Sequence, residues 1–310
     1  MHNGVMKIGL VCISEILKHK NKSQAFKTMT RKRFSQLERS FAIAELSSRI
    51  LHNCKLTEQI IRHCASIGVS HYRISSCIAP LITDSILNLS FEDLPDEKAI
   101  GQALLRAGQL SKLLKVSVSS HPDQFNVLSS YNEITVERSI NELNHQAYIL
   151  DLMGLPQNHS APMCLHLNLS PDFKREDIES YISRFKNSFS RCSTSVQNRL
   201  VLENEDGGYW KAQNLFDCFG DFIPLVFDNL HDLCNPSDSC YINRFKSTWG
   251  AYTPIMHWSE GTKEKQRSHA EFASHLPQVV QNNLDCVWEF ELKGKDKAII
   301  KVLNNQYETA

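Results

Sequence analysis

LVLENED, residues 200–206, is a short apolar run that ends in acids, with Glu203 directly after its last apolar residue. The same pattern returns along the chain, where other apolar runs end in a carboxylate or an imidazole. These runs are Ser117–His121, Met163–His166, Leu200–Glu203, Leu225–His231, Pro254–His257 and Trp288–Glu291, and His269 follows in a separate Arg-Ser-His. A single such ending is common. Its repetition predicts that many potential ligands converge at one end of a barrel.

Apolar runs of strand length alternate with longer segments of helical period. The expected strands are Lys7–Val11, His71–Ile74, Val116–Ser119, Met163–Leu167, Leu200–Leu202, Pro224–Phe227, Pro254–Met256 and Val287–Phe290. The expected helices are Thr57–Ile67, Glu97–Leu114, Thr135–Met153, Arg175–Phe185, Lys211–Phe219, Ser268–Val280 and Lys295–Leu303. Strands that are each followed by helical sequence predict a single (β/α)8 TIM barrel, whose active site lies at the C-terminal ends of the strands.

The length of 310 residues and the 42% hydrophobic content suit one barrel domain with a large core. We expect this domain to span residues 7–305, after a disordered leader at 1–6 and before a tail at 306–310. Lys+Arg and Asp+Glu are balanced at 34 each, so no overall charge points to a polyanionic partner. Locally, the segment from Lys18 to Arg33 is basic and contains no acid, which is compatible both with a solvated loop and with a phosphate-contacting arm.

The 10 cysteines are scattered and have no zinc-site spacing. With no signal peptide in the sequence, they are expected to be reduced thiols in a cytoplasmic protein, or a nuclear one in a eukaryotic host. No apolar stretch approaches the length needed to span a membrane. We therefore expect a protein that acts away from membranes, as a monomer.

The side chains at the ends of the runs are oxygen and nitrogen ligands of the kind that hard divalent metals bind. The expected ligands are His121, His166, Glu203, Asp228, His231, His257, His269 and Glu291. Several ions can share bridging carboxylates, and a group of buried acids is costly unless a cation neutralises it. The sequence therefore predicts a multinuclear metalloenzyme, with catalysis centred on Glu203, His121 and Asp228.

Ordered motifs over nearly the whole chain resemble the UV damage endonuclease family. They are Tyr72-Arg73-Ile74-Ser75-Ser76 with Pro80, His121-Pro122-Asp123-Gln124-Phe125, Leu202-Glu203-Asn204-Glu205-Asp206, Val226-Phe227-Asp228 with His231, Met256-His257-Trp258-Ser259, Arg267-Ser268-His269-Ala270, and Glu291 with Lys293 and Lys295-Asp296-Lys297-Ala298. The resemblance implies a TIM barrel that holds up to three divalent ions, usually manganese. It also implies incision of damaged double-stranded DNA on the 5′ side of UV photoproducts, leaving a 3′-hydroxyl and a 5′-phosphate.

The same resemblance implies roles for individual residues. The eight side chains named above would be the metal ligands, and Asp84 would be a further one, at a position where the family has a histidine. Gln124 and Phe125 would fill the gap left in the base stack at a damaged dinucleotide, with Arg73, Lys32 and Arg33 as further contacts to DNA. A second difference from the family is Ile255, where the family usually has a lysine.

Three other functions are compatible with the same pattern. An apurinic-site endonuclease on this barrel would use a similar ligand set. A sugar isomerase or epimerase would also bind divalent metals, but it would have no affinity for DNA and no role for the basic segment. A catalytically weakened lesion-binding protein would fit the changes at Asp84 and Ile255, although retained Glu203, Asp228 and Glu291 favour an active enzyme.

Overall fold

The structure, a computed structural model, describes residues 6–169 and 178–308. Within these residues the strands are β1 (Lys7–Val11), β2 (His71–Arg73), β3 (Ser117–Ser119), β4 (Met163–His166), β5 (Leu200–Glu203), β6 (Leu225–Val226), β7 (Ile255–Trp258) and β8 (Val287–Phe290). Each predicted strand is present, with ends that differ by no more than two residues. Nearly every residue in them is buried, as expected for parallel strands that are covered on both faces.

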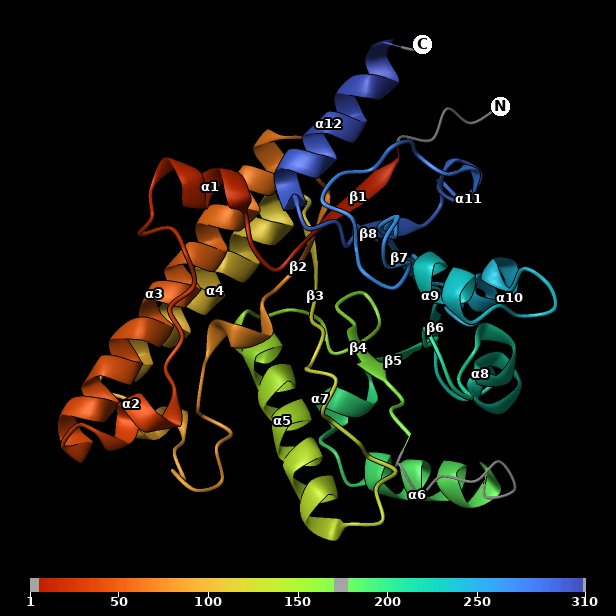
Figure 1. Ribbon diagram of the computed structural model, residues 1–310. Coiled ribbons are helices and arrows are strands. Elements are labelled where there is room, and N and C mark those ends of the chain that lie inside the picture. The colour runs from red at the N-terminus through yellow and green to blue at the C-terminus, as the bar shows by residue number, and fades with distance from the viewer. Residues whose placement is uncertain (1–5, 170–177, 309–310) are drawn as a thin grey trace.

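The strands form a closed parallel barrel (Figure 1). Five of them pair in the order β3-β2-β1-β8-β7 and three in the order β4-β5-β6. Isolated parallel bridges join the two groups, between Ser120 and Met163 on one side and between Asp228 and His257 on the other. The predicted (β/α)8 barrel is confirmed, and its C-terminal strand ends share one mouth.

Helices surround the strands. They are α1 (Glu15–Lys20), α2 (Arg31–Ser35), α3 (Arg39–Ser66), η1 (Ser76–Ile78), η2 (Phe91–Asp93), α4 (Glu97–Leu113), α5 (Glu133–Leu152), α6 (Ile178–Ser190), α7 (Thr194–Gln197), α8 (Ala212–Phe219), α9 (Asn229–Cys234), α10 (Ile242–Ser247), α11 (Gln278–Gln281) and α12 (Lys295–Glu308). None of the helices in the described ranges is long and apolar enough to cross a membrane.

Helix α3 is much longer than the sequence analysis predicted. It has 28 residues and begins at Arg39, whereas the prediction covered only Thr57–Ile67. Its first half carries a four-residue repeat, Ala42, Leu46 and Ile50, whose members are all buried. Charged and serine residues lie between the members of this repeat and lower the apolar content of the segment, so it was not predicted as a helix. The helix packs along α4 at one end of the molecule (Figure 1).

The helix predicted at Ser268–Val280 is wrong. Only Gln278–Gln281 is helical there, because the segment turns back on itself: Gly261 and His269 form an antiparallel bridge. At the C-terminus α12 continues to Glu308, past the expected domain end at residue 305. Residues 1–5 of the expected leader, 309–310 of the expected tail and 175–177 of the predicted helix Arg175–Phe185 lie outside the described residues.

Candidate metal centre

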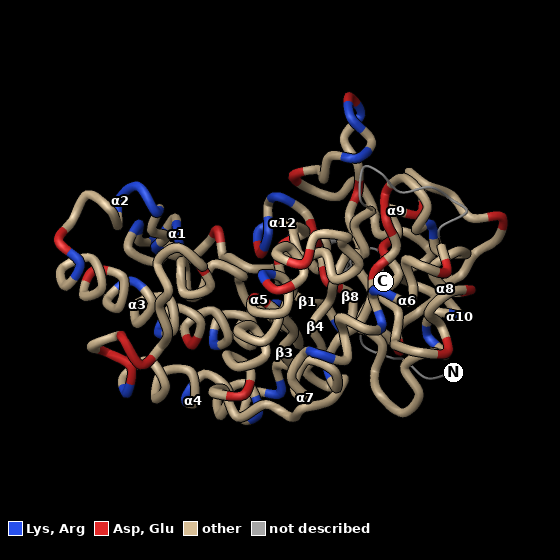
Figure 2. Tube along the Cα trace, turned by 90° about the horizontal axis from the view of Figure 1, so that it is seen from below, with Lys and Arg blue, Asp and Glu red and all other residues tan. Residues whose placement is uncertain are grey.

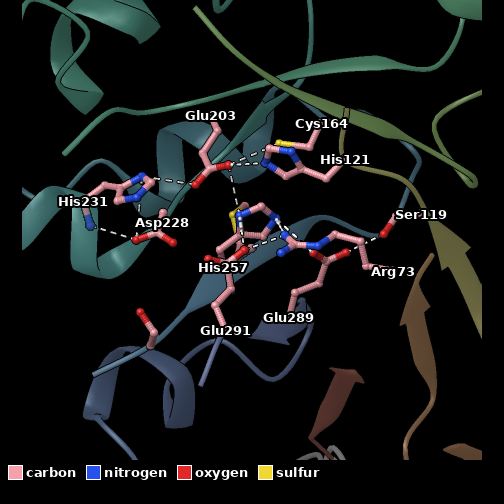
Figure 3. A network of polar contacts seen from close by, with 12 residues as sticks. Arg73, Ser119, His121, Cys164, Glu203, Asp228, His231, His257, Glu289 and Glu291 are labelled. Atoms are coloured by element: carbon pink, nitrogen blue, oxygen red, sulfur yellow. Dashed lines mark hydrogen bonds and ion pairs between the residues drawn. The ribbon is translucent and has the colours of Figure 1, made fainter. Parts of the chain in front are cut away.

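Glu203, the last residue of β5, lies at the centre of the mouth of the barrel and is 1% exposed. Its two carboxylate oxygens face four imidazoles, and Figure 3 shows those of His121, His231 and His257. Oε2 lies 3.1 Å from Nε2 of His121, 3.5 Å from Nε2 of His166 and 3.1 Å from Nδ1 of His257. Oε1 lies 3.1 Å from Nδ1 of His231. Strand ends that are distant in the sequence therefore meet on one carboxylate, as predicted.

A second carboxylate, Asp228, follows β6 and is fully buried. It caps α9, where one of its oxygens accepts a 2.8 Å hydrogen bond from the backbone N–H of His231. Its Oδ2 has no hydrogen-bond partner among the described residues. A buried carboxylate oxygen with no donor is costly, so a bound cation would be its natural partner.

Glu291 completes the mouth just after β8. Its Oε1 lies 3.6 Å from Nδ1 of His257, and its Oε2 lies 3.8 Å from Nε2 of His269. His269 is the most exposed of the expected ligands in this region and approaches the centre only through Glu291. The long loop after β7 carries it there.

Three overlapping sets of side chains have the ligand-atom spacing of metal sites. They are His121 with Cys164, Glu203 and His257; Glu203 with Asp228 and His231; and Asp228 with His257 and Glu291. Each of Glu203, Asp228 and His257 belongs to two sets. Shared carboxylates between adjacent sets are typical of sites that hold more than one divalent ion, so the residues present fit such a centre.

At the mouth, burial and the neighbouring charges act in opposite directions on the pKa values of the acids and imidazoles. Burial raises the pKa of Asp228, and the nearby charge of Glu203 adds to this. Burial also acts to raise the pKa of Glu203, but His257 and His166 outweigh it and hold this pKa well below its usual range. Burial lowers the pKa of His231, whereas Asp228 and Glu203 raise it to a net value of about 11. The raised pKa of His231 therefore favours a positive charge beside the two acids, where a cation could also lie.

Asp84 is the expected ligand that the structure does not bring to the mouth. Like His166 and His269, it belongs to none of the potential metal sets found among the described residues, but those two histidines contact Glu203 and Glu291. Its carboxylate instead pairs with Arg31 at 2.7 Å and accepts hydrogen bonds from the backbone N–H groups of Ile86 and Leu87. A short side chain held by its own turn in this way cannot also reach the centre.

Sequence reasoning missed Cys164, Asn204 and Glu289. The Cys164 thiol donates to Oε2 of Glu203 across 3.5 Å, and burial raises the pKa of this thiol well above its usual range. Asn204 bonds to the backbone of Asp228 in both directions, at 2.8 and 3.1 Å, and so fixes the end of β5 against the end of β6. Its position directly after Glu203 was the available signal.

The expected DNA contacts fall into two groups. Gln124 and Phe125 are exposed on the loop after β3, and Phe125 is 80% exposed, unusual for a large aromatic side chain. Arg73, however, is only 7% exposed and pairs with Glu289 and Glu291 inside the barrel. This burial argues against direct contact of Arg73 with DNA and assigns it to the network behind the centre.

The basic segment is partly helical. Its last residues form α2, and Figure 2 shows basic residues gathered there. Arg33 pairs with Glu45 of α3 at 2.9 Å, whereas Lys32 is exposed. One positive charge is therefore already balanced, and the contact of Lys32 and Arg33 with DNA stays a prediction.

Fold and site together define a class, the (β/α)8 TIM barrels with a carboxylate and imidazole cluster at the mouth. D-psicose 3-epimerase from Clostridium cellulolyticum H10 superposes with a TM-score of 0.51 at 11% identity, covering 93% of this chain and 85% of that one. The crystal structure of SacUVDE superposes far better, with a TM-score of 0.80 at 24% identity, covering 98% and 99% of the two chains. These likenesses concern the fold.

The family follows from the sequence. The family model UV-endonuclease UvdE matches residues 6–309. The UV DNA damage endonuclease of Nostoc sp. is 28% identical over 310 residues, covering 96% of this chain and 89% of that protein. The enzyme of the same name from Bacillus velezensis is 27% identical, covering 89% and 87%. The chain belongs to the UV-endonuclease family, and the resemblance found from its motifs is confirmed.

Proposed function

We propose that this protein is a metal-dependent DNA repair endonuclease that nicks the phosphodiester on the 5′ side of UV photoproducts, leaving a 3′-hydroxyl and a 5′-phosphate. Membership of the UV-endonuclease family supports a repair nuclease that acts on UV lesions. The observation that carries the metal dependence is the buried Glu203 carboxylate, which is common to two adjacent ligand sets at the mouth. We propose manganese, in up to three ions, as the metal.

The ligands in this proposal are those that the mouth brings together. They are His121, His166, Glu203, Asp228, His231, His257, His269 and Glu291. When bound, divalent ions supply Lewis acidity and positive charge for hydrolysis of the phosphodiester. Glu203 would contribute to two of the ligand sets. Asn204, through the backbone of Asp228, and the bond from the N–H of His231 to the Asp228 carboxylate would hold Asp228 in position during the reaction.

Recognition of the lesion is proposed for the loop after β3. A damaged dinucleotide stacks poorly and is cheaper to displace than an intact step. The exposed ring of Phe125, with Gln124 beside it, could occupy the space left in the stack. We propose that the protein does this as a monomer on double-stranded DNA, in the compartment that holds the chromosome, cytoplasm or nucleus.

The test is nicking of supercoiled plasmid, either UV-irradiated, depurinated or untreated, with manganese and with chelator. We expect nicking that requires both irradiation and manganese. Ends that a polymerase extends and a ligase seals would establish the 3′-hydroxyl and 5′-phosphate. Cleavage of the depurinated plasmid alone would replace the lesion class with abasic sites. Absence of nicking on all three plasmids, with metal bound, would reject the nuclease and favour a sugar substrate or a lesion-binding role.

A further inference from the structure

A layer of polar side chains lies inside the barrel, directly below the metal centre. Strand register puts Gly9 of β1 beside both His71 of β2 and Glu289 of β8, and Glu289 beside His257 of β7. A Cβ at position 9 would lie 2.8 Å from Cδ2 of His71 and 3.2 Å from Cγ of Glu289. The absence of a side chain on Gly9 therefore leaves the room that the imidazole and the carboxylate occupy.

Glu289 is 1% exposed, and both of its oxygens are fully used (Figure 3). Oε1 accepts from the Ser119 hydroxyl at 2.5 Å and lies 2.9 Å from Nε2 of His71. Oε2 accepts from Nη1 of Arg73 at 2.9 Å and lies 3.1 Å from Nε2 of His257. Such a complete set of partners is what a buried carboxylate needs in order to remain charged.

Both ring nitrogens of His257 therefore face carboxylates. Nε2 faces Glu289, away from the mouth, and Nδ1 faces Glu203 at 3.1 Å and Glu291 at 3.6 Å. Nδ1 is buried and has no well-oriented hydrogen bond among the described residues. An imidazole binds a metal through a nitrogen that carries no proton, so the location of the proton decides whether His257 can be a ligand.

We propose that Glu289 is a positioning residue that keeps the proton of His257 on Nε2, so that the Nδ1 lone pair faces the ligand sets of Glu203 and Glu291. This inference rests on the metal dependence proposed above and adds a residue behind the ligands. Arg73 and the Ser119 hydroxyl hold the Glu289 carboxylate in place from the opposite sides. A carboxylate that orients a ligating histidine is a common device in metal sites.

The opposite tautomer has one argument in its favour. Nη1 of Arg73 lies 3.5 Å from Nε2 of His257 and could donate to a bare nitrogen there. The carboxylate oxygen is closer, at 3.1 Å, and a bare Nε2 would place two lone pairs against each other in a site closed to water. Arg73 also has shorter contacts to Glu289 and Glu291, so it does not need this acceptor.

The first test uses the unchanged protein. Protein with isotope-labelled histidine is loaded with zinc, which is diamagnetic, and long-range proton–nitrogen spectra identify which ring nitrogen carries the proton. His257 is assigned by comparison with a His257→Gln variant. We expect a protonated Nε2 and a bare, metal-shifted Nδ1. A proton on Nδ1 with a bare Nε2 would overturn the proposal, and this result does not depend on whether any Glu289 variant folds.

The second test measures manganese affinity by paramagnetic resonance of the free ion. We expect Glu289→Gln to weaken binding roughly 10–100-fold, the range for residues that orient metal ligands. Glu289→Asp, which keeps the charge on a shorter side chain, should fall between this variant and the wild type. The matched control is Asp151→Asn. Asp151 pairs at 2.7 Å with the fully buried Arg199, just as Glu289 pairs with the buried Arg73. It should lose stability without losing manganese affinity.

The two proposals fail in different ways. Wild-type protein that binds no manganese would reject the proposed metal-dependent function itself. Wild-type protein that binds manganese, together with a folded Glu289→Gln variant of equal affinity, would reject only the positioning role. An equal loss of affinity in Asp151→Asn would also reject it, since the effect would then come from general destabilisation.

Discussion

The Glu203 carboxylate contacts four imidazoles at the barrel mouth. Replacing Glu203 is therefore the most direct test of the centre. Glu203→Gln keeps the volume but removes the charge that His257, His231 and His121 face. We expect nicking of irradiated plasmid to fall by more than about 100-fold, because even residues behind the ligands cost about 10–100-fold. Circular dichroism should report an unchanged fold.

The control for this change is Glu58→Gln on α3, whose carboxylate contacts only Arg62 and Arg106 in the described part of the chain. It makes the same chemical substitution away from the mouth and should leave nicking intact. Full activity in Glu203→Gln would contradict the assigned centre.

Phe125 is the second residue whose surroundings lead to a prediction. Since its ring is 80% exposed, Phe125→Ala should change the free energy of unfolding by less than about 0.5 kcal/mol. Its loss should nevertheless weaken binding to irradiated duplex by about 1–3 kcal/mol relative to intact duplex, the range for stacking of one base on an aromatic ring. Competition binding with the two duplexes measures this preference.

Phe41→Ala provides the comparison for Phe125, because Phe41 on α3 is also a highly exposed phenylalanine, at 70%. We expect it to leave the preference for damaged DNA unchanged. If both variants keep the wild-type preference, the wedge role of Phe125 is wrong.

Among the elements, the contact between α4 and the end of α5 depends on one glycine. A Cβ on Gly108 would lie 1.8 Å from the carbonyl oxygen of Met153, which caps the C-terminus of α5. Gly108→Ala should destabilise the protein by about 1–3 kcal/mol through overpacking. Gly101, seven residues earlier in α4, has open space around its Cβ position. Gly101→Ala should stabilise by about 0.5–1 kcal/mol, and urea unfolding compares the two.

Opposite signs for these two variants are the expected result. Similar effects from both would mean that helix propensity, rather than the close approach of α5, governs this interface.

The start of α12 is joined to α1 and α3 by one buried carboxylate. Asp296 accepts from Nε2 of His63 and from the backbone N–H of Glu15, both at 2.9 Å, and also from the Ser14 hydroxyl. Burial acts to raise the pKa of Asp296, but the hydrogen bonds from His63 and Ser14 outweigh it, and the pKa is lowered. The ionised Asp296 carboxylate therefore stabilises the folded protein fully at a pH above its ordinary pKa of 3.8. This stabilisation is lost as the pH falls through the lower pKa that Asp296 has in the folded protein.

Asp296→Asn should therefore cost about 1–3 kcal/mol at pH 7, the range for leaving buried partners unsatisfied. The difference between variant and wild type should shrink as the pH is lowered below 4. Urea unfolding across this range measures it. A difference that stays constant with pH would show that the charge of Asp296 contributes nothing to the joint.

At the scale of the whole molecule, the proposed metal centre links the two groups of strands. Its proposed ligands come from both groups. Four lie at the ends of β4, β5 and β6 or in the segments that follow them (His166, Glu203, Asp228 and His231), and four lie near the ends of β3, β7 and β8 or in the segments that follow them (His121, His257, His269 and Glu291). Within residues 6–169 and 178–308, one isolated bridge joins the two groups on each side. Bound ions would therefore hold the barrel closed where its hydrogen-bonded sheet is weakest.

Metal binding should accordingly raise thermal stability. Manganese at 100 times its dissociation constant would add about 2.7 kcal/mol to the free energy of unfolding, and chelator would remove it. Differential scanning calorimetry of the wild type and Glu203→Gln, each with manganese and with chelator, tests this. We expect a large shift in the wild type and a much smaller one in the variant. Equal shifts would place the stabilising ions elsewhere.

Much of the barrel could be predicted because its signal is local. Each apolar run indicates a strand from its own residues. Likewise, the apolar residues that recur at helical spacing in the predicted helix Thr135–Met153 are buried on α5: Val136, Ile140, Leu143, Ala147 and Leu150. The first half of α3 was missed although its buried repeat is local, because charged and serine residues lie between the apolar ones. The loop at 259–277 was misjudged because the chain turns back on itself there, which local periodicity does not reveal. That His121, His231 and His257 lie at the same end of the barrel as Glu203 could be predicted from the pattern of strand ends.

By itself, the sequence determined the alternation of strands and helices, the family, and which residue types stand at the strand ends. Only the tertiary structure decided which of them face the same space. Residues two apart on a strand share a face, so Glu289 and Glu291 both point inward. The register of β8 with Gly9 and His257 places Glu289 behind the centre, whereas Glu291 lies in the centre. The tertiary structure also turns Arg73 inward, toward Glu289, and pairs Asp84 with Arg31. Such pairings depend on distances between segments far apart in the chain.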